Sequence, residues 1–228
     1  MAEHIPMDGE RYRTLVRECV EPYAPLGRMT HGYVRGKLLH DPVYQQLAQR
    51  GPFAGPLCDL GCGRGQTTLL LSKLQPELEG VGFDWDESKL SLARAAAKGA
   101  QAGRLRYVPG DLQSLDVPPS GTILMLDVLH YNPIEIQDQM LRRAAEALLP
   151  GGRLFLREVD ANGSLRARIN QWQERLGCWL RLNRGATLSF RSIAEIEEVL
   201  QGHGLKTRSH GSFAGTPLAN VLIEASAP

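Results

Sequence analysis

The chain has 228 residues, 43% of them hydrophobic, which is enough for one sizeable core. Its formal net charge of +1 gives no reason to expect a nucleic-acid partner. The N-terminus has no apolar segment of the secretory type, and no apolar run approaches the roughly 18 residues of a membrane span. The four cysteines lack the paired spacing of a zinc site and suit a reducing compartment. We therefore expect a cytoplasmic protein that has no metal centre and does not use a membrane.

The order of the expected elements indicates an α/β fold. Residues 1–55 have a mostly helical pattern, and from residue 56 onward strand-like runs alternate with helical ones. This alternation predicts a parallel sheet with crossover helices on both faces. The turn at 149–152, of sequence Leu-Pro-Gly-Gly, should end one helix and start the next strand. We expect strands at 57–60, 80–84, 105–108, 122–127, 153–159, 205–210 and 219–225, and helices at 66–75, 86–98, 134–148 and 191–202.

An additional amphipathic helix is expected at 164–182, where five apolar residues recur at helical spacing. The stretch 163–191 around it carries six arginines and one acid, Glu174. Such a run of arginines is commonly a solvated helix face. Alternatively, the helix could form a lid that attracts an anionic substrate or partner. The apolar residues are Leu165, Ile169, Trp172, Leu176 and Trp179, and the arginines are Arg166, Arg168, Arg175, Arg181, Arg184 and Arg191.

Three glycines at alternate positions follow the first strand, namely Gly61, Gly63 and Gly65. Asp59 precedes them and Cys62 lies among them. Glycine lets the backbone turn tightly and approach a ligand, and open α/β sheets bind ligands at the carboxyl ends of their strands. The stretch could also be only a tight strand–helix connection. Because its spacing differs from the dinucleotide fingerprint and it lacks the Gly-Lys-Ser/Thr of a phosphate loop, it does not indicate phosphate binding.

Acidic residues stand at or just after the ends of four successive strands. Asp84 could accept hydrogen bonds from both hydroxyls of a ribose, and Trp85 could pack on an adenine ring. Asp84 could instead cap the following helix, although Asp86 is better placed for that role. Asp111 could accept a hydrogen bond from an exocyclic amine while Leu112 packs on the ring. The four acids are Asp59, Asp84, Asp111 and Asp127, and Val128 follows the last of them.

Together these motifs resemble those of the class I S-adenosylmethionine-dependent methyltransferases, from about residue 55 to the C-terminus. The resemblance implies a three-layer Rossmann-like sandwich whose seven-stranded sheet has the order 3-2-1-4-5-7-6, with strand 7 antiparallel. The matching segments are 59–65 (glycine-rich first motif), 82–84 (ribose motif), 110–112 (adenine contact), 127–131 (fourth-strand motif) and 149–152 (the turn before strand five).

The resemblance also implies that S-adenosylmethionine is the cofactor. It is a zwitterion with an added sulfonium charge, so acids around its amine and ribose are favourable and phosphate-binding lysines are unnecessary. We expect cofactor contacts from Asp59, Gly61, Cys62, Gly63, Gly65, Asp84, Trp85, Asp111, Leu112, Asp127 and Val128.

Two histidines are candidate catalytic bases. Methyl transfer is an in-line displacement, so orientation and exclusion of water are its main requirements. An oxygen or nitrogen acceptor that must lose a proton also needs a base, and a histidine titrates near neutrality. His130 lies three residues past Asp127, and His31 lies in the N-terminal segment. For His130 the alternative is a structural or pocket-shaping role, because the family often has a histidine there.

Departures from related families narrow the expected chemistry. The sequence that begins at Asp127 is not the Asp/Asn-Pro-Pro-Tyr motif of amino-directed nucleic-acid methyltransferases. The adjacent Asp-Asn pair of metal-dependent catechol-type enzymes is interrupted here, because Ala161 separates Asp160 from Asn162. This spacing also favours a site without a metal.

We therefore expect a methyltransferase that acts on a small organic acceptor through an oxygen or carbon nucleophile. One alternative is an acceptor displayed on an acidic carrier protein or on RNA, which the arginine-rich stretch would favour. Another is a non-catalytic module that binds S-adenosylmethionine and regulates a partner. One domain is expected over 1–228, with an N-terminal helical cap (1–55), a cofactor-binding half (56–162), a helical substrate roof (163–190) and a C-terminal helix with strands (191–228).

Overall fold

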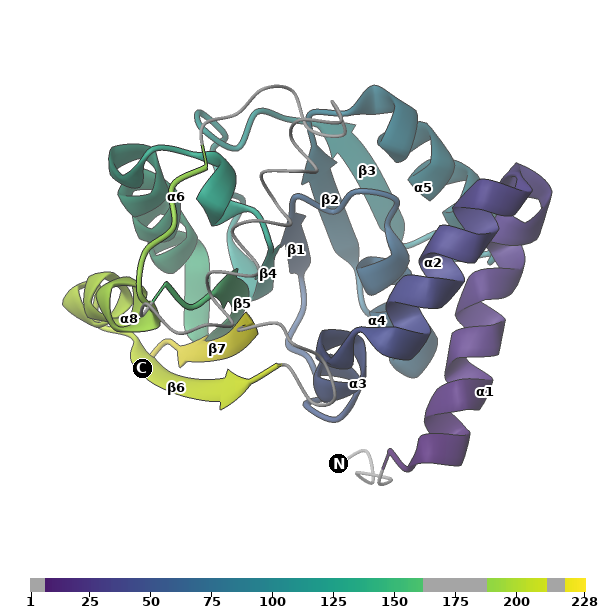
Figure 1. Ribbon diagram of the computed structural model, residues 1–228, viewed down its shortest axis with the longest axis horizontal. Coiled ribbons are helices and arrows are strands. Elements are labelled where there is room, and N and C mark those ends of the chain that lie inside the picture. Colours follow the sequence, from purple (N-terminus) through teal and green to yellow (C-terminus); the bar gives the residue numbers. More distant parts are fainter. Residues whose placement is uncertain (1–6, 162–187, 213–219) are drawn as a thin grey trace. The chain divides into compact units, whose positions relative to one another are not determined.

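The computed structural model describes residues 7–161, 188–212 and 220–228 (Figure 1). Its seven strands form one sheet of order β3-β2-β1-β4-β5-β7-β6, which confirms the order expected from the family motifs. Strand β7 is antiparallel to both β5 and β6, as expected. The strands are β1 (Leu57–Leu60), β2 (Gly80–Asp84), β3 (Leu105–Pro109), β4 (Ser120–Leu126), β5 (Leu148–Val159), β6 (Lys206–Gly211) and β7 (Asn220–Ser226).

The chain divides into two compact units, here called the first and the second unit. The first comprises Met1–Leu112 and Ser120–Thr122, and the second comprises Gln113–Pro119 and Ile123–Pro228. The helices of the first unit are α1 (Gly9–Val20), the 3₁₀ helix η1 (Glu21–Leu26), α2 (Arg28–His40), α3 (Pro42–Ala48), α4 (Gln66–Leu74) and α5 (Glu87–Gly99). Those described in the second unit are the 3₁₀ helix η2 (Leu129–Tyr131), α6 (Ile134–Ala147) and α8 (Ile193–Gly202).

In the first unit β1, β2 and β3 are parallel; α5 packs against β2 and β3, and α4 packs against β3. All four residues of β1 are buried, as expected for a central parallel strand. Helix α1 begins at Asp8, whose carboxylate accepts hydrogen bonds from two backbone N–H groups of the first turn. Its apolar residues recur at helical spacing and are buried, and α1 lies beside α2 (Figure 1).

In the second unit, α6 packs on β5, and α8 packs on β6 and β7. Helix α8 starts with a capping box, in which Ser192 and Glu195 each bond to the other's backbone N–H. Phe155 and Leu156 of β5 and Ile223 of β7 are completely buried. The packing of these helices and the burial of these side chains stabilise the antiparallel end of the sheet.

The structure differs from the expected elements at two strand boundaries. Strand β5 begins at Leu148, directly after α6, so the Leu-Pro-Gly-Gly stretch belongs to the strand rather than to a separate turn. There Gly151 donates to the Pro228 carbonyl, and the Gly152 carbonyl accepts from Ala227. Strand β4 ends at Leu126 because Asp127 has a φ of 59°. The other expected helices and strands match within two residues, and the helix expected at 164–182 lies outside the described residues.

Among the described residues, no helix is both long enough and apolar enough to cross a membrane.

Candidate cofactor site and catalytic residues

The glycine-rich segment 61–65 forms a tight loop between β1 and α4, both in the first unit. The loop closes with a hydrogen bond of 2.9 Å from the Gly65 N–H to the Cys62 carbonyl. Gly63 and Gly65 have φ values of 54° and 74°, a region that favours glycine. A Cβ on Gly65 would lie 2.7 Å from the Tyr107 ring, whereas a Cβ on Gly63 would meet no atom within 4 Å. Gly65 is therefore needed for packing, while Gly63 borders open space where a ligand could approach.

Two tyrosines stabilise this loop through hydrogen bonds, and neither was identified from the sequence. The Tyr107 hydroxyl lies 2.6 Å from the Thr68 hydroxyl, which donates to the Gly65 carbonyl. Tyr23 of η1 donates from its hydroxyl to the Arg64 carbonyl, at 2.7 Å. In the sequence of β3, Leu105 and Tyr107 alternate with the charged Arg106. This alternation was the available signal that Tyr107 is buried.

Asp84 ties the end of β2 to the glycine loop. One of its carboxylate oxygens accepts from the Gly63 N–H and the other from the Asp86 N–H, both at 2.9 Å. The side chain is 6% exposed. The cap of α5 is Asp86, whose carboxylate accepts from two backbone N–H groups of the first turn. Asp84 is therefore not the cap, and each of its oxygens has a further lone pair for a ligand hydroxyl.

Asp59 is a buried carboxylate close to Asp84. Its Oδ2 atom is buried without a hydrogen-bond partner among the described residues. Burial, together with the nearby carboxylate of Asp84, raises the pKa of Asp59 to about 7. An uncompensated acidic group of this kind would be stabilised by a cationic ligand group.

Of the other expected cofactor residues of the first unit, Cys62 is buried, whereas Trp85, Asp111 and Leu112 are at least partly exposed. Trp85, immediately after Asp84, is half exposed, and the Lys89 ammonium lies 5.6 Å from its ring centroid. Asp111 is exposed and Leu112 is partly buried. The Gly110 N–H donates to the Asp84 carbonyl, which joins the loop after β3 to the end of β2.

These residues fit S-adenosylmethionine. The unpaired carboxylate of Asp59 suits its ammonium group, the two oxygens of Asp84 suit the ribose diol, and the exposed ring of Trp85 suits a flat base. Residues 59–68 contain no lysine that would bind a phosphate, and two carboxylates would repel one. The first unit thus offers candidate binding groups for the ammonium, the ribose and the base of this cofactor.

The second unit holds Asp127 in an ion pair with Arg157 of β5. The guanidinium donates to both oxygens of the Asp127 carboxylate, with Nε at 2.8 Å from Oδ1. Arg157 is 2% exposed, while the Asp127 side chain is 31% exposed. Val128, beside it, is buried. The positive φ of Asp127 turns the chain at the end of β4 and lets this pairing form.

His130 forms a buried pair with Glu158 of β5. The Nδ1 atom of His130 lies 2.6 Å from Oε2 of Glu158, and the two side chains are 3% and 4% exposed. The other carboxylate oxygen, Oε1, accepts from the Leu129 N–H at 2.7 Å. Phe190 stacks on the imidazole with ring centroids 5.5 Å apart. Glu158 thereby fixes the orientation of the ring.

The sequence analysis missed both β5 partners, Arg157 and Glu158. The available signal was two adjacent charged residues inside an otherwise apolar strand, where a buried charge needs a partner. Their partners lie 30 and 28 positions earlier in the chain. A single sequence does not reveal pairings over such separations.

His31, the second candidate base, lies on α2 and lines a pocket formed with α1 and η1. None of the glycine-loop residues lines that pocket. The structure therefore groups His31 with the N-terminal helices rather than with the loop.

Comparison with known proteins identifies the family. The model of a family described as "Methyltransferase domain" matches residues 54–205. The chain belongs to the class I S-adenosylmethionine-dependent methyltransferases. The matched region includes the glycine loop, all four strand-end acids and the His130–Glu158 pair.

Relatives share the sequence of this chain over part of their length. A trans-aconitate 2-methyltransferase of Sinorhizobium fredii is 36% identical over 107 residues, which are 47% of this chain and 39% of that protein. A trans-aconitate 2-methyltransferase of Deinococcus radiodurans is 32% identical over 171 residues, which are 70% of this chain and 61% of that protein. The chain thus spans less than two thirds of either relative.

Solved structures share the fold of this chain. An O-methyltransferase family 2 protein from Planctomyces limnophilus, in complex with apigenin, has a TM-score of 0.67 at 21% identity over 93% of this chain and 62% of that one. Magnesium protoporphyrin IX methyltransferase from Synechocystis has a TM-score of 0.66 at 19% identity over 95% of this chain and 96% of that one. At these identities the likeness concerns the fold alone.

Proposed function

We propose that this protein transfers the methyl group of S-adenosylmethionine to an oxygen nucleophile of a small organic acceptor, with His130 as the base. The observation that carries the proposal is the buried 2.6 Å contact between His130 Nδ1 and Glu158 Oε2. The bound cofactor supplies an activated methyl group on a sulfonium sulfur. The acceptor oxygen forms a bond to that methyl group as the bond from sulfur to carbon breaks.

Glu158 acts as a positioning residue for the base. Its carboxylate accepts a hydrogen bond from the Nδ1–H group of His130, which leaves the imidazole lone pair on Nε2. The Leu129 N–H holds the other oxygen of Glu158, and the stacked Phe190 ring limits rotation of the imidazole. An acceptor hydroxyl within reach of Nε2 would lose its proton there as the oxygen attacks the methyl carbon. Glu158 also stabilises the imidazolium that forms.

The cofactor-binding part of the proposal rests on the first unit. Asp59 would bind the cofactor ammonium, Asp84 the ribose diol, and Gly63 would leave room for the ligand. Open α/β sheets bind ligands at the carboxyl ends of their strands, and the glycine loop and Asp84 lie at the carboxyl ends of β1 and β2. Their position on the strands thus favours the same location as their side chains do.

The names of relatives support a small acceptor with a reactive oxygen. Besides the trans-aconitate enzymes, a demethylspheroidene O-methyltransferase of Rhodobacter capsulatus is 30% identical over 46% of this chain. An RNA or carrier-protein acceptor was suggested by the arginine-rich stretch 163–191, most of which lies outside the described residues. Arg191, which is described, forms an ion pair with Asp138 of α6 and is therefore already neutralised within the chain.

The proposal is tested by methyl transfer from labelled S-adenosylmethionine to a panel of small carboxylic acids and phenols. If the acceptor is a hydroxyl compound, His130→Gln should lower turnover by about 10²- to 10⁴-fold with cofactor affinity unchanged, whereas a carboxylic acid is already ionised and needs no base. Glu158→Gln should lower turnover less and shift the pH profile, because the carboxylate no longer stabilises the imidazolium. His203→Gln and Glu224→Gln remove an exposed histidine and a surface-paired glutamate, and serve as controls.

A loss below about tenfold in His130→Gln would remove His130 as the base and leave it a pocket residue. Absence of S-adenosylmethionine binding by the purified protein would overturn the function itself. Methylation of RNA or of a carrier protein, with none of any small molecule, would overturn the acceptor class.

A further inference from the structure

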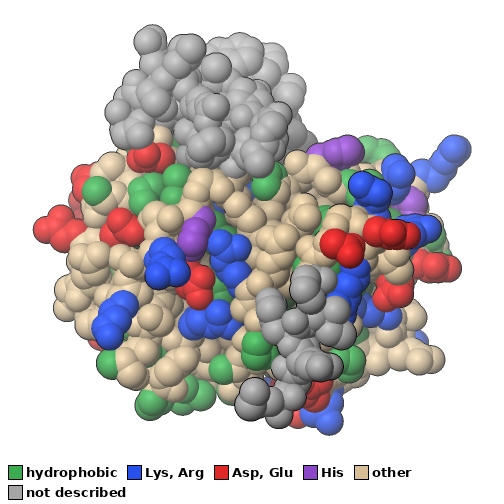
Figure 2. Space-filling view, turned by 90° about the horizontal axis from the view of Figure 1, so that it is seen from below, with side chains coloured by type: hydrophobic (Ala, Val, Ile, Leu, Met, Phe, Trp, Pro, Cys, Tyr) green, Lys and Arg blue, Asp and Glu red, His purple; other side chains and the backbone are tan. Residues whose placement is uncertain are grey.

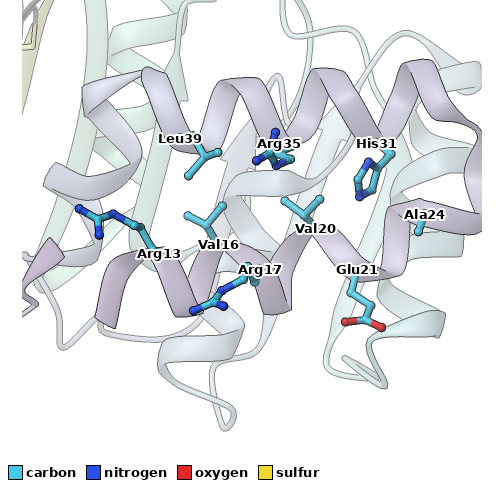
Figure 3. A pocket seen from close by; sticks show the side chains of 9 residues that line it. All are labelled: Arg13, Val16, Arg17, Val20, Glu21, Ala24, His31, Arg35 and Leu39. Carbon is cyan, nitrogen blue, oxygen red and sulfur yellow. The ribbon is translucent and has the colours of Figure 1, made fainter. Parts of the chain in front are cut away.

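A pocket of about 650 Å³ lies between α1, η1 and α2 in the first unit (Figure 3). This volume falls within the usual range for small-ligand sites, roughly 300–1,000 Å³. Val16 and Val20 of α1 and Leu39 of α2 supply its apolar lining, with Ala24 of η1 at one end. Both valines are at most 4% exposed, so the floor of the pocket belongs to the packed helix pair.

The polar lining of the pocket is strongly cationic. Arg13 and Arg17 come from α1, Arg35 and His31 come from α2, and Glu21 is the single acid. Within the described parts of the chain, none of the three guanidiniums forms an ion pair; Arg17 bonds only to the Thr14 hydroxyl, at 3.2 Å. On the face shown in Figure 2, by contrast, basic and acidic side chains are interspersed. The pocket thus concentrates positive charge that the chain itself does not neutralise.

The pocket and the glycine loop contact different faces of α2. His31, Arg35 and Leu39 recur every four residues and therefore share one face of α2. Tyr33 projects from a different face, where its ring lies 4.2 Å from the Arg64 guanidinium of the glycine loop. Helix α2 thus presents the pocket on one side and contacts the loop on the other.

We propose that the α1–α2 pocket binds an amphipathic anion, with its oxyanion head group at the arginines and its apolar body along Val16, Val20 and Leu39. Guanidinium groups donate paired hydrogen bonds to carboxylates and phosphates alike, so both head groups share this chemistry. A small, purely polar anion is not the best ligand for this pocket. It has no apolar surface to bury against the two valines and the leucine, so it gains no hydrophobic free energy there. The proposal is independent of the proposed function.

The test uses titration calorimetry of the full chain with decanoate, decyl phosphate and, as the uncharged match, decanol. Decanoate or decyl phosphate should bind at least tenfold more tightly than decanol, and the tighter of the two identifies the head group. The double variant Arg17→Gln with Arg35→Gln should weaken the anion by about tenfold or more. Ala24→Glu, at an exposed lining position, should weaken it through charge repulsion. Arg208→Gln, on the exposed edge strand β6, is the matched control and should bind as the wild type does.

Equal binding of the three probes, or unchanged anion binding in the double variant, would overturn the proposal. A different occupant would also be visible. If a second copy of the chain covers this face, sedimentation velocity will show a dimer that the double variant dissociates, and decanoate will not bind. Circular dichroism shows whether each variant is folded. If the double variant does not fold, Ala24→Glu alone tests the proposal.

Discussion

At the scale of single residues, Asp59 lowers stability and is a proposed cofactor-binding residue. Its carboxyl group is buried, has no partner at Oδ2 and lies near Asp84. In the described part of the chain no cationic side chain pairs with it, as expected for a group that binds a cationic ligand. Buried groups of this kind often reduce stability at functional sites.

Asp59 should therefore make the ligand-free protein less stable as the pH rises. In the unfolded chain it ionises near its ordinary pKa of 3.8, but in the folded chain burial raises that pKa to about 7. Between these values only the folded state holds the proton, so stability falls as the pH rises from about 4 to 7, by roughly 4 kcal/mol at most. Asp59→Asn removes this dependence, so its melting temperature should exceed that of the wild type at pH 7.5 by more than at pH 5.

Thermal melts at pH 5, 6, 7 and 7.5 check this prediction, with Asp116→Asn as the exposed control. Adding S-adenosylhomocysteine should narrow the gap between wild type and Asp59→Asn, because its ammonium neutralises the wild-type carboxylate. Parallel curves for the two proteins at every pH would show that Asp59 is not an uncompensated buried acid.

At the scale of elements, the loop between β1 and α4 uses two glycines for different reasons. Both have positive φ, so alanine strains the backbone at either position by about 1 kcal/mol. At Gly65 the new methyl would also overlap the Tyr107 ring, which adds roughly 1–3 kcal/mol. At Gly63 it would enter open space, on the side proposed for the ligand.

Gly65→Ala should therefore lower the melting temperature more than Gly63→Ala, whereas Gly63→Ala should weaken S-adenosylhomocysteine binding while the fold is kept. Gly204→Ala is the control, because Gly204 has a φ of 84° and also borders open space, but follows α8 in the second unit. Calorimetric titration and thermal melts measure both effects. Equal affinity in Gly63→Ala and Gly204→Ala would show that no ligand approaches Gly63.

The sequence predicted the elements of this fold better than the contacts between them. Strands β1 and β2 matched in full because each is a short apolar run bounded by glycine, proline or aspartate, which are local signals. The family motifs predicted the sheet order. The pairing of His130 with Glu158, and of Asp127 with Arg157, depends on which strand lies beside β4 and on its register. Neither is a local property, so both partners were missed.

At the scale of the whole molecule, the candidate groups divide between the two compact units. Asp59, Asp84 and the glycine loop belong to the first, and His130 with Glu158 belongs to the second. Strand β4 contributes to both, because Ser120–Thr122 belong to the first unit and the strand continues in the second. Unfolding of one unit would therefore disrupt a strand of the other, which favours a single cooperative transition.

Ligand binding to the first unit should accordingly stabilise the whole chain. S-adenosylhomocysteine at 100 times its Kd adds about 2.7 kcal/mol, which for a chain of this size raises the melting temperature by roughly 5–10 °C in one transition. NAD at the same concentration should give no shift, because Asp59 and Asp84 repel phosphate and the loop has no lysine to bind it. Differential scanning calorimetry measures both. Two separate peaks, of which only one moves with ligand, would show that the units unfold independently, and a larger shift with NAD would contradict the assigned cofactor.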